Sequence, residues 1–195
     1  FEGYHDRTVG GLRWNYYRCR AEGSNTLVIN PGLGVDQDPT ARGQVTKFVK
    51  GDDGGYAIMD MKAAYPDVKS LYRGIKLYDN RSKVIVQDEI ETTKPSEVYW
   101  FGHTTSEIEI LENKKTAILA NGGKKLQAQI ISPSNAEFSV MEAKPLPTSP
   151  EAKMGDNSKY RKLTVHLQNV LNARIEIAFI PLPDGEIANE FPENQ

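Results

Sequence analysis

The chain has 195 residues, of which 38% are hydrophobic and 26% are charged, and this suits one domain with a substantial buried core. Its formal net charge of -2 gives no basic field for wrapping a polyanion, so we expect no nucleic-acid partner and only local arginines to hold an acidic ligand. A single cysteine excludes an internal disulfide framework, and no apolar run approaches the roughly 20 residues of a membrane span, so we expect no membrane partner.

The first residues of the chain carry none of the blocks of a secretory signal peptide, and they begin at Phe1. We therefore expect a mature or excised piece of a longer protein. Aromatic and arginine side chains then crowd into the segment from Trp14 to Arg20. Aromatic rings stack on sugar rings and Arg offers a planar fork to carboxylates, so this segment is either a sugar-binding surface or a buried aromatic segment.

The chain from Thr26 onward predicts an all-β fold. Strands are predicted over residues 26–29, 45–50, 56–61, 68–78, 83–91, 98–105, 107–111, 116–120, 124–132 and 136–141. Turn residues at 51–55, 79–82 and 121–122 predict hairpins. The spacing favours a single antiparallel β-sandwich (supersandwich-like) over residues 1–195, with roughly ten to twelve short strands.

Two clean alternations of apolar and polar residues close the chain, at 163–167 and 175–179. We predict that they form a hairpin through Leu171 and Asn172. Residues 1–23 are expected to be a segment that packs on an upstream domain, and residues 182–195 are expected to be a loosely held acidic tail.

Some polar residues fall at positions that need an explanation. Asp88 lies in an apolar row, where it needs a partner such as an Arg. His103 shares a face with two neighbouring aromatics, which favours a core or rim residue over a catalyst. Asp36 and Asp38 lack the spacing of an EF-hand, so we expect solvated charges there and assign no metal.

The segment from Tyr16 to Pro31, YYRCRAEGSNTLVINP, resembles the strand motif of heparinase II/III-like polysaccharide lyases. Residues 60–65, 78–90, 100–104 and 126–138 also look like successive parts of the carboxy-terminal sheet region of that family. The resemblance implies an enzyme in two parts, an amino-terminal helical toroid and this sandwich. An acidic polysaccharide such as heparan sulfate or alginate is then cleaved by β-elimination in the cleft between them. The resemblance also implies a periplasmic or secreted protein.

In that chemistry a carboxylate is neutralised so that a Tyr or His can remove the adjacent proton. The family takes these groups from the toroid and from an Asn-His-x-His-x-Asp segment, which has no counterpart here. We therefore expect no catalytic residue in this chain and no activity from it alone. The candidates for one wall of the substrate cleft are Tyr17, Arg18, Arg20 and Asn25.

Ser24 stands where the family commonly has the His of a His-Asn-Thr-Leu motif, a ligand of a structural zinc. A serine hydroxyl is a poor zinc ligand beside an imidazole. We therefore expect no metal and no cofactor in this chain, while a full-length parent could hold zinc or calcium.

Two other functions fit the sequence. An exposed aromatic platform would favour a non-catalytic carbohydrate-binding module. Full burial of Trp14, Tyr16 and Tyr17 would favour a sandwich that is purely structural.

Overall fold

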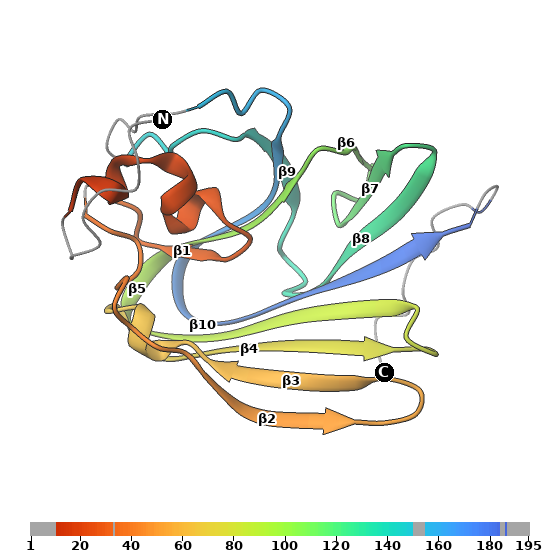
Figure 1. Ribbon diagram of the computed structural model, residues 1–195, viewed down its shortest axis with the longest axis horizontal. Coiled ribbons are helices and arrows are strands. Elements are labelled where there is room, and N and C mark those ends of the chain that lie inside the picture. Colours follow the sequence, from red (N-terminus) through yellow and green to blue (C-terminus); the bar gives the residue numbers. More distant parts are fainter. Residues whose placement is uncertain (1–10, 33, 150–154, 184–185, 187–195) are drawn as a thin grey trace.

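The computed structural model describes residues 11–32, 34–149, 155–183 and 186 (Figure 1). Ten strands are present in the described residues: β1 (Leu27–Ile29), β2 (Gln44–Lys50), β3 (Gly55–Asp60), β4 (Val68–Tyr78), β5 (Lys83–Thr104), β6 (Glu107–Ile110), β7 (Thr116–Asn121), β8 (Lys124–Ser132), β9 (Phe138–Glu142) and β10 (Arg161–Leu182). Four 3-10 helices accompany them: η1 (Leu12–Asn15), η2 (Tyr17–Cys19), η3 (Ala21–Gly23) and η4 (Lys62–Ala64). The predicted all-β class and the strand number are confirmed. The expectations for residues 1–10 and for most of the 182–195 tail lie outside the described residues.

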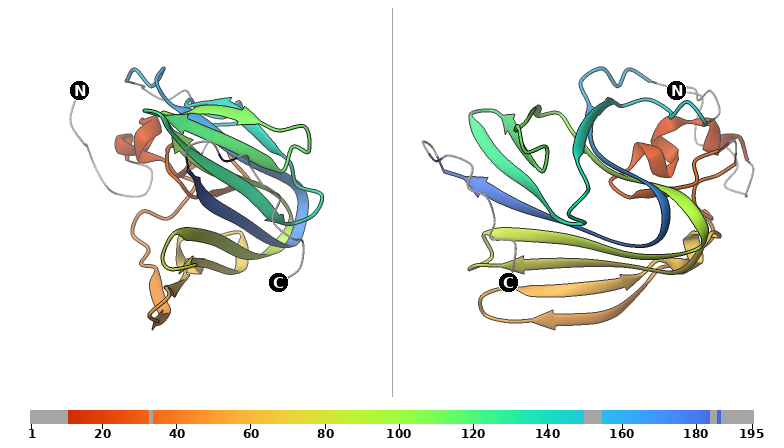
Figure 2. Two further views of the ribbon diagram at one scale, coloured as in Figure 1. Left: turned by 90° about the vertical axis from the view of Figure 1, so that its right-hand side faces the viewer. Right: turned by 180° about the vertical axis from the view of Figure 1, so that it is seen from behind.

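The strands form one antiparallel sheet in the order β2-β3-β4-β5-β10-β8-β7-β6, with β1 added on β5 and β9 added on β10. Because β5 and β10 bend together, this sheet folds into two layers (Figures 1 and 2). The large layer holds β2, β3, β4, the first half of β5, the second half of β10, and β8, β7 and β6. The small layer holds β1, the second half of β5, the first half of β10, and β9.

Two predictions of short strands were wrong. Residues 83–91 and 98–105 belong to the single strand β5, and the predicted terminal hairpin through Leu171 and Asn172 is the single strand β10. The two strands pair from Arg161↔Thr104 to Phe179↔Val84, with register shifts between Leu167 and Asn172. The apparent break is therefore a bend that both strands share, since a bulge bends a strand without reversing it.

The predicted tight turns are confirmed. Asp79 and Asn80 have φ values of 52° and 51° in the β4–β5 hairpin, a left-handed backbone that Asp and Asn tolerate better than most residues. Gly122 and Gly123 have φ values of 56° and 74° between β7 and β8. In the β2–β3 turn, a Cβ on Gly54 would lie 2.0 Å from the carbonyl oxygen of Leu77, so only glycine fits there.

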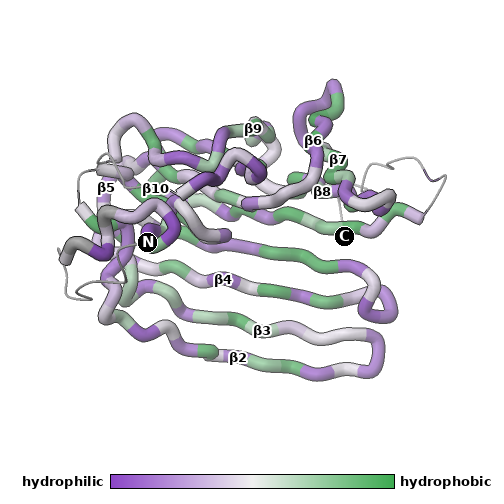
Figure 3. Tube along the Cα trace, turned by 45° about the horizontal axis from the view of Figure 1, so that its top comes forward, coloured by the Kyte–Doolittle hydropathy of each residue, from purple (hydrophilic) through white to green (hydrophobic). Residues whose placement is uncertain are grey.

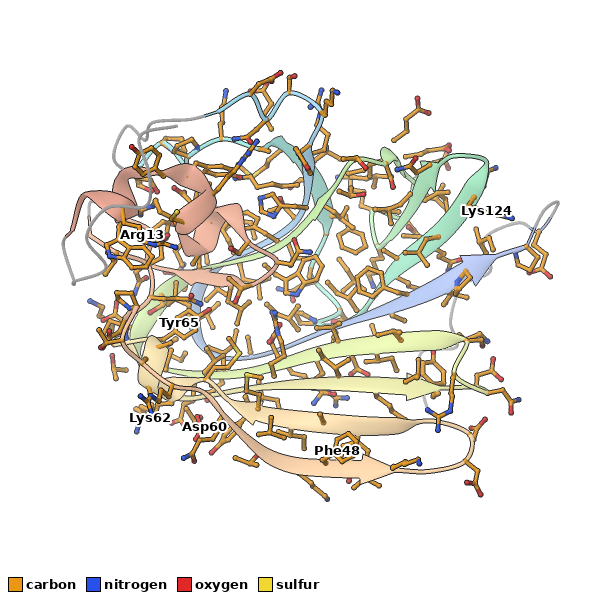
Figure 4. The ribbon with its side chains drawn as sticks, in the orientation of Figure 1. Arg13, Phe48, Asp60, Lys62, Tyr65 and Lys124 are labelled. Carbon is orange, nitrogen blue, oxygen red and sulfur yellow. The ribbon has the colours of Figure 1, made fainter. Side chains whose placement is uncertain are left out.

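The core lies between the two layers. The large layer contributes Leu71, Ile90, Ala117, Ala128, Ile130, Ile175 and Ile177, and the small layer contributes Leu27, Val98, Trp100, Phe138, Leu163 and Val165. Tyr65 closes one end, where its hydroxyl donates to the Leu27 carbonyl oxygen at 2.9 Å (Figure 4). Each large side chain buried here contributes about 1.5–3 kcal/mol of hydrophobic stabilisation.

The core-facing side of β2, β3 and β4 continues beyond the part that the small layer covers. Register pairs place Phe48, Ala57, Ile75, Val86 and Ile177 in one row across five strands. Ile177 is fully buried, yet Ile75 is 49% exposed and Phe48 is 72% exposed. Figures 3 and 4 show hydrophobic residues along these outer strands and Phe48 on β2. We call this uncovered area the apolar shelf.

Candidate functional site

The amino-terminal segment packs on the outer face of the small layer. Tyr17 and Ala21 are buried there, and Ala21 forms a second hydrophobic cluster with Val28, Phe101 and Leu146. Residues 17–23 therefore cover this domain's own sheet, and the candidate side chains around them are fixed by that packing.

Tyr17 and Asn25, two of the four candidates for substrate contact, meet at His103. The Tyr17 hydroxyl lies 2.9 Å from His103 Nε2, and Asn25 Oδ1 lies 2.7 Å from the His103 backbone nitrogen and 3.2 Å from Nδ1. A backbone N–H can only donate, so the oxygen of the Asn25 amide faces His103 and Nδ1 carries the hydrogen. It follows that Nε2 accepts from the Tyr17 hydroxyl, and that this tautomer of His103 is fixed.

A buried lysine lies against this cluster. Lys162 is 0% exposed, and its Nζ lies 4.4 Å from the centre of the Phe101 ring and 5.6 Å from that of the Tyr17 ring. Its Nζ donates a hydrogen bond to the carbonyl oxygen of Lys144, at 3.0 Å. Burial lowers the pKa of Lys162 to about 8, because the charged form loses water while rings and one carbonyl replace it.

The same environment keeps His103 and Tyr17 neutral. Burial, helped by the nearby Lys162 charge, lowers the pKa of His103 to about 4. Burial, helped by the Glu22 carboxylate, raises the pKa of the Tyr17 hydroxyl well above its usual range. With both ring nitrogens of His103 occupied and Tyr17 only 2% exposed, this cluster holds a geometry and is not placed to take a proton from a ligand.

One donor of the cluster remains open. Asn25 uses Oδ1 for His103 and its backbone oxygen for Arg73 Nη1, at 2.9 Å. Its side-chain Nδ2 has no hydrogen-bond partner among the described residues, and the residue is exposed. Asn25 thus presents a pre-oriented N–H donor to solvent, a group that suits a sugar hydroxyl or a carboxylate.

The two candidate arginines lie elsewhere. Arg18 is exposed, and it donates through Nε to Asn157 Oδ1 at 2.8 Å and through Nη2 to the Asp156 carbonyl oxygen at 3.0 Å. Arg20 is 4% exposed and forms ion pairs with Glu22 at 3.0 Å and Asp36 at 2.9 Å. A guanidinium buried in this way anchors the segment and is not accessible to a substrate.

The Arg20 ion pairs correct one expectation about the 32–43 loop. Asp36 is 9% exposed, so it is not a solvated loop charge, whereas Asp38 is exposed as predicted. Burial raises the pKa of Asp36 to about 6, with the Arg20 charge partly offsetting the effect. Glu22 completes the network, because its Oε2 accepts from the Leu146 N–H at 3.0 Å and from the Ser149 hydroxyl at 2.9 Å.

The predicted partner of Asp88 is Arg73. The guanidinium binds both carboxylate oxygens, at 2.7 and 2.8 Å, and its third contact is the Asn25 backbone oxygen. Asp88 is fully buried and the Arg73 side chain is 14% exposed, so this pair bridges the large layer to the start of β1. Arg73 therefore holds the backbone of Asn25 through its carbonyl oxygen, while His103 holds the side chain of Asn25 through Oδ1.

Ser24 lies at the position of the family's zinc ligand. The Ser24 hydroxyl donates to the Arg20 carbonyl oxygen at 3.4 Å. No group of three or more His, Cys, Asp or Glu side chains suitable for a metal occurs in the part of the chain that the structure describes. None of the described helices is long and apolar enough to cross a membrane.

Sequence reasoning missed Lys162 and Glu22. Lys162 reads as an ordinary charge at the start of a strand, and only the register pair Lys162↔His103 brings it beneath the cluster. The two-residue spacing from Phe101 placed His103 on the aromatic face of its strand, but its partners Tyr17, Asn25 and Lys162 come from distant parts of the chain, so their meeting could not be predicted.

No protein-family model and no curated protein sequence matches the chain. Solved structures with a similar fold include the heparan sulfate lyase HepC from Pedobacter heparinus, with a TM-score of 0.68 and 14% identity, covering 89% of this chain and 26% of that one. A heparinase III gene product gives a TM-score of 0.65 and 11% identity, covering 85% and 25% of the two chains. A crystal structure of heparinase III gives 0.59 and 14%, covering 81% and 23%.

The chain therefore spans about a quarter of the length of these neighbours. At such identities the likeness shows the fold, and it agrees with the resemblance read from the sequence.

Proposed function

We propose that this chain is the carboxy-terminal sheet domain of a heparinase II/III-like polysaccharide lyase. It forms one wall of the cleft in which a uronic-acid-containing polysaccharide, such as heparan sulfate or alginate, is cleaved by β-elimination. The observation that carries the proposal is a fold shared over 89% of the chain with a heparan sulfate lyase, combined with the exposed, pre-oriented Asn25 donor. A helical toroid in the same parent chain supplies the catalytic groups, and the parent acts in the periplasm or outside the cell.

The cluster at His103 supports a positioning role in this wall. Asn25 Nδ2 donates to a uronate carboxylate or a sugar hydroxyl, while Tyr17, His103 and Arg73 keep the amide in place. Such a donor holds a sugar unit and helps to neutralise the carboxylate whose adjacent proton is lost. No titrating group of the cluster takes part in proton transfer, so the base and the acid come from the other wall.

Arg18 provides the positive charge that a polyanion requires on a domain with a net charge of -2. Two of its guanidinium nitrogens bind Asn157 and Asp156, and Nη1, which has no hydrogen-bond partner among the described residues, is available for a carboxylate or sulfate oxygen. Because Arg18 is exposed and Arg20 is buried, only Arg18 contacts the substrate.

The apolar shelf supports the presence of a companion domain. Val45, Phe48, Met59 and Ile75 are 60%, 72%, 40% and 49% exposed on the side of the sheet that elsewhere forms the core. Apolar area of this kind is costly to leave in water, and three quarters of each similar lyase chain lies outside the shared fold.

Titration of the isotope-labelled chain with an alginate or an unsulfated heparosan hexasaccharide, followed by NMR, tests the proposed wall. We expect the backbone amides of Arg18, Asn25 and His103 to shift, and Asn25→Asp to weaken binding at least tenfold, since the variant keeps the oxygen that His103 needs and replaces the free donor by an anion. Asn80→Asp, in the β4–β5 turn, is the charge-matched control. Shifts elsewhere only, or equal affinities of the two variants, would contradict the proposal.

A further inference from the structure

A second polar groove lies at the bend of β10. This strand pairs with β5 along one edge, while its other edge pairs with β9 over 161–165 and with β8 over 176–182. Between these stretches the second edge has no strand partner among the described residues, and the loop after β8 lies beside it. The bend and the loop enclose an open groove of about 700 Å³.

Unpaired carboxamides dominate this groove. Asn135, Gln168, Asn169 and Asn172 line it, are exposed, and have no side-chain hydrogen-bond partner among the described residues. Each carboxamide offers both a donor and an acceptor, as a sugar hydroxyl does. Leu171, 48% exposed in the same lining, adds an apolar surface for the C–H face of a sugar ring.

His166, at one end of the groove, is held rigidly. Its Nε2 lies 2.8 Å from Glu97 Oε1, and its ring stacks on Tyr99 with 4.1 Å between centres and 3° between planes. The Tyr99 hydroxyl donates to the same Glu97 oxygen at 3.0 Å. Because Nε2 faces the carboxylate, Nδ1 is the ring nitrogen without a partner among the described residues, and it is open to a ligand hydroxyl. A group fixed in this way loses little conformational entropy on binding.

The edge suits a saccharide better than a peptide strand. Register shifts between Leu167 and Val170 and between Val170 and Asn172, together with φ of 56° at Asn169, interrupt the regular spacing of backbone groups along this stretch. An added strand needs that spacing to form a ladder, and bulges are a common means of blocking such pairing. Hydroxyl groups have no such requirement.

The charges of the groove favour an uncharged ligand. The Arg174 guanidinium donates through Nη2 to the Glu176 carboxylate, and the His166 ring lies against the Glu97 carboxylate, so two carboxylates accompany one guanidinium here. A sulfate or uronate would therefore meet two carboxylates beside a single guanidinium. Arg18 of the proposed lyase wall differs, because among the described residues its guanidinium binds a carboxamide and a backbone carbonyl and no carboxylate.

We propose that this groove is a second saccharide-binding site, specific for an uncharged, hydroxyl-rich segment of a glycan. It lies at the bend of β5 and β10, whereas Asn25 and His103 lie at the far end of the second half of β5. The two sites are separate, and this one takes an uncharged sugar whereas the surface at Asn25 takes an acidic one. The present proposal therefore does not depend on the lyase proposal.

NMR titration of the full chain with cellohexaose, maltohexaose and chitohexaose, and with heparosan hexasaccharide as the acidic comparison, tests the site. We expect at least one neutral hexasaccharide to shift backbone amides between 166 and 174, with little change at Asn25. The double substitution Gln168→Ala/Asn172→Ala should weaken that binding at least tenfold. Gln44→Ala, which removes an exposed amide on β2, should leave it unchanged.

Three results would overturn the proposal: no shift in this stretch with any neutral hexasaccharide at millimolar concentration, equal affinity of the double variant, or shifts there with the acidic sugar alone. Shifts at Asn25 with the acidic sugar bear only on the proposed lyase wall, so the two proposals fail separately.

Discussion

Removing the positive charge at Arg73 tests how the two layers are joined. Asp88 is fully buried, and Arg73 supplies both of its short side-chain contacts. Arg73→Met keeps the length of the side chain and leaves a buried carboxylate without a partner, which costs about 3–5 kcal/mol of unfolding free energy at pH 7. Lys69→Met breaks the exposed Lys69–Glu91 pair and should cost no more than about 0.5 kcal/mol.

The loss should also depend on pH. Burial already raises the pKa of Asp88, and the Arg73 guanidinium partly offsets this effect. Without Arg73 the folded-state pKa rises further above that of the unfolded chain, so the protonated form stabilises the fold at low pH and this stabilisation is lost as pH rises. The destabilisation by Arg73→Met should therefore shrink between pH 7 and pH 5, by at most about 1.4 kcal/mol per pH unit.

Urea unfolding followed by tryptophan fluorescence measures both effects, and the double variant Arg73→Met/Asp88→Leu completes the cycle. We expect the double variant to be more stable than Arg73→Met, because it removes the unpaired charge. A loss at Arg73 as small as that at Lys69, a loss independent of pH, or a double variant no better than the single one would refute this reasoning.

Three further predictions concern the core, the metal and His103. Phe179→Ala should lower the unfolding free energy by about 2–5 kcal/mol, because Phe179 packs on the core beside Trp100. In the same urea titration, Phe48→Ala should change it by less than about 1 kcal/mol, because Phe48 is exposed on the apolar shelf. Elemental analysis after dialysis should find no stoichiometric zinc, and one tightly bound zinc per chain would contradict the interpretation of Ser24. Because the pKa of His103 is lowered to about 4, the neutral ring stabilises the fold above its ordinary pKa near 6.5, and this stabilisation is lost as pH falls towards 4. His103→Gln should remove this contribution to the fall of the unfolding free energy with decreasing pH, while the raised pKa of Asp36 contributes in the opposite direction. The same pH dependence in wild type and variant would be the contrary result.

The strands could be predicted because their signals are local. Turn residues and the regular spacing of strand-like segments predicted β4 and β8 at their observed bounds. Asp79, Asn80 and Gly122 marked the hairpins through backbone preferences that a single residue carries. The long strands could not be predicted in this way. Pro95 lies in a stretch of β5 that has no partner on β10, and a proline in such a stretch is typical of the end of a strand. Only the pairing of β5 with β10 on both sides of this stretch shows that the strand bends and continues.

The candidate site could be predicted only in part, because only some of its signals are local in the sequence. Tyr17 and Asn25 stand close in sequence, and the resemblance pointed to them, but their meeting at His103 depends on the pairing of β1 with β5. Arg20 shows why the rest of the site could not be predicted. An arginine beside aromatic residues suggested a sugar contact, but Arg20 is buried in an ion pair with Asp36, and the sequence around Asp36 suggests only a solvated loop.

The most direct test of the proposed function is the ultraviolet absorbance of the unsaturated uronate that β-elimination produces. The 195-residue chain should form none above background from heparan sulfate, alginate or hyaluronan, because under the proposal it supplies one wall of the cleft and the base comes from another domain. The same chain extended upstream through a helical domain should act on at least one of them, and Asn25→Asp should slow it at least tenfold. Turnover by the 195 residues alone, or an extended chain that acts on none of these substrates, would contradict the assignment.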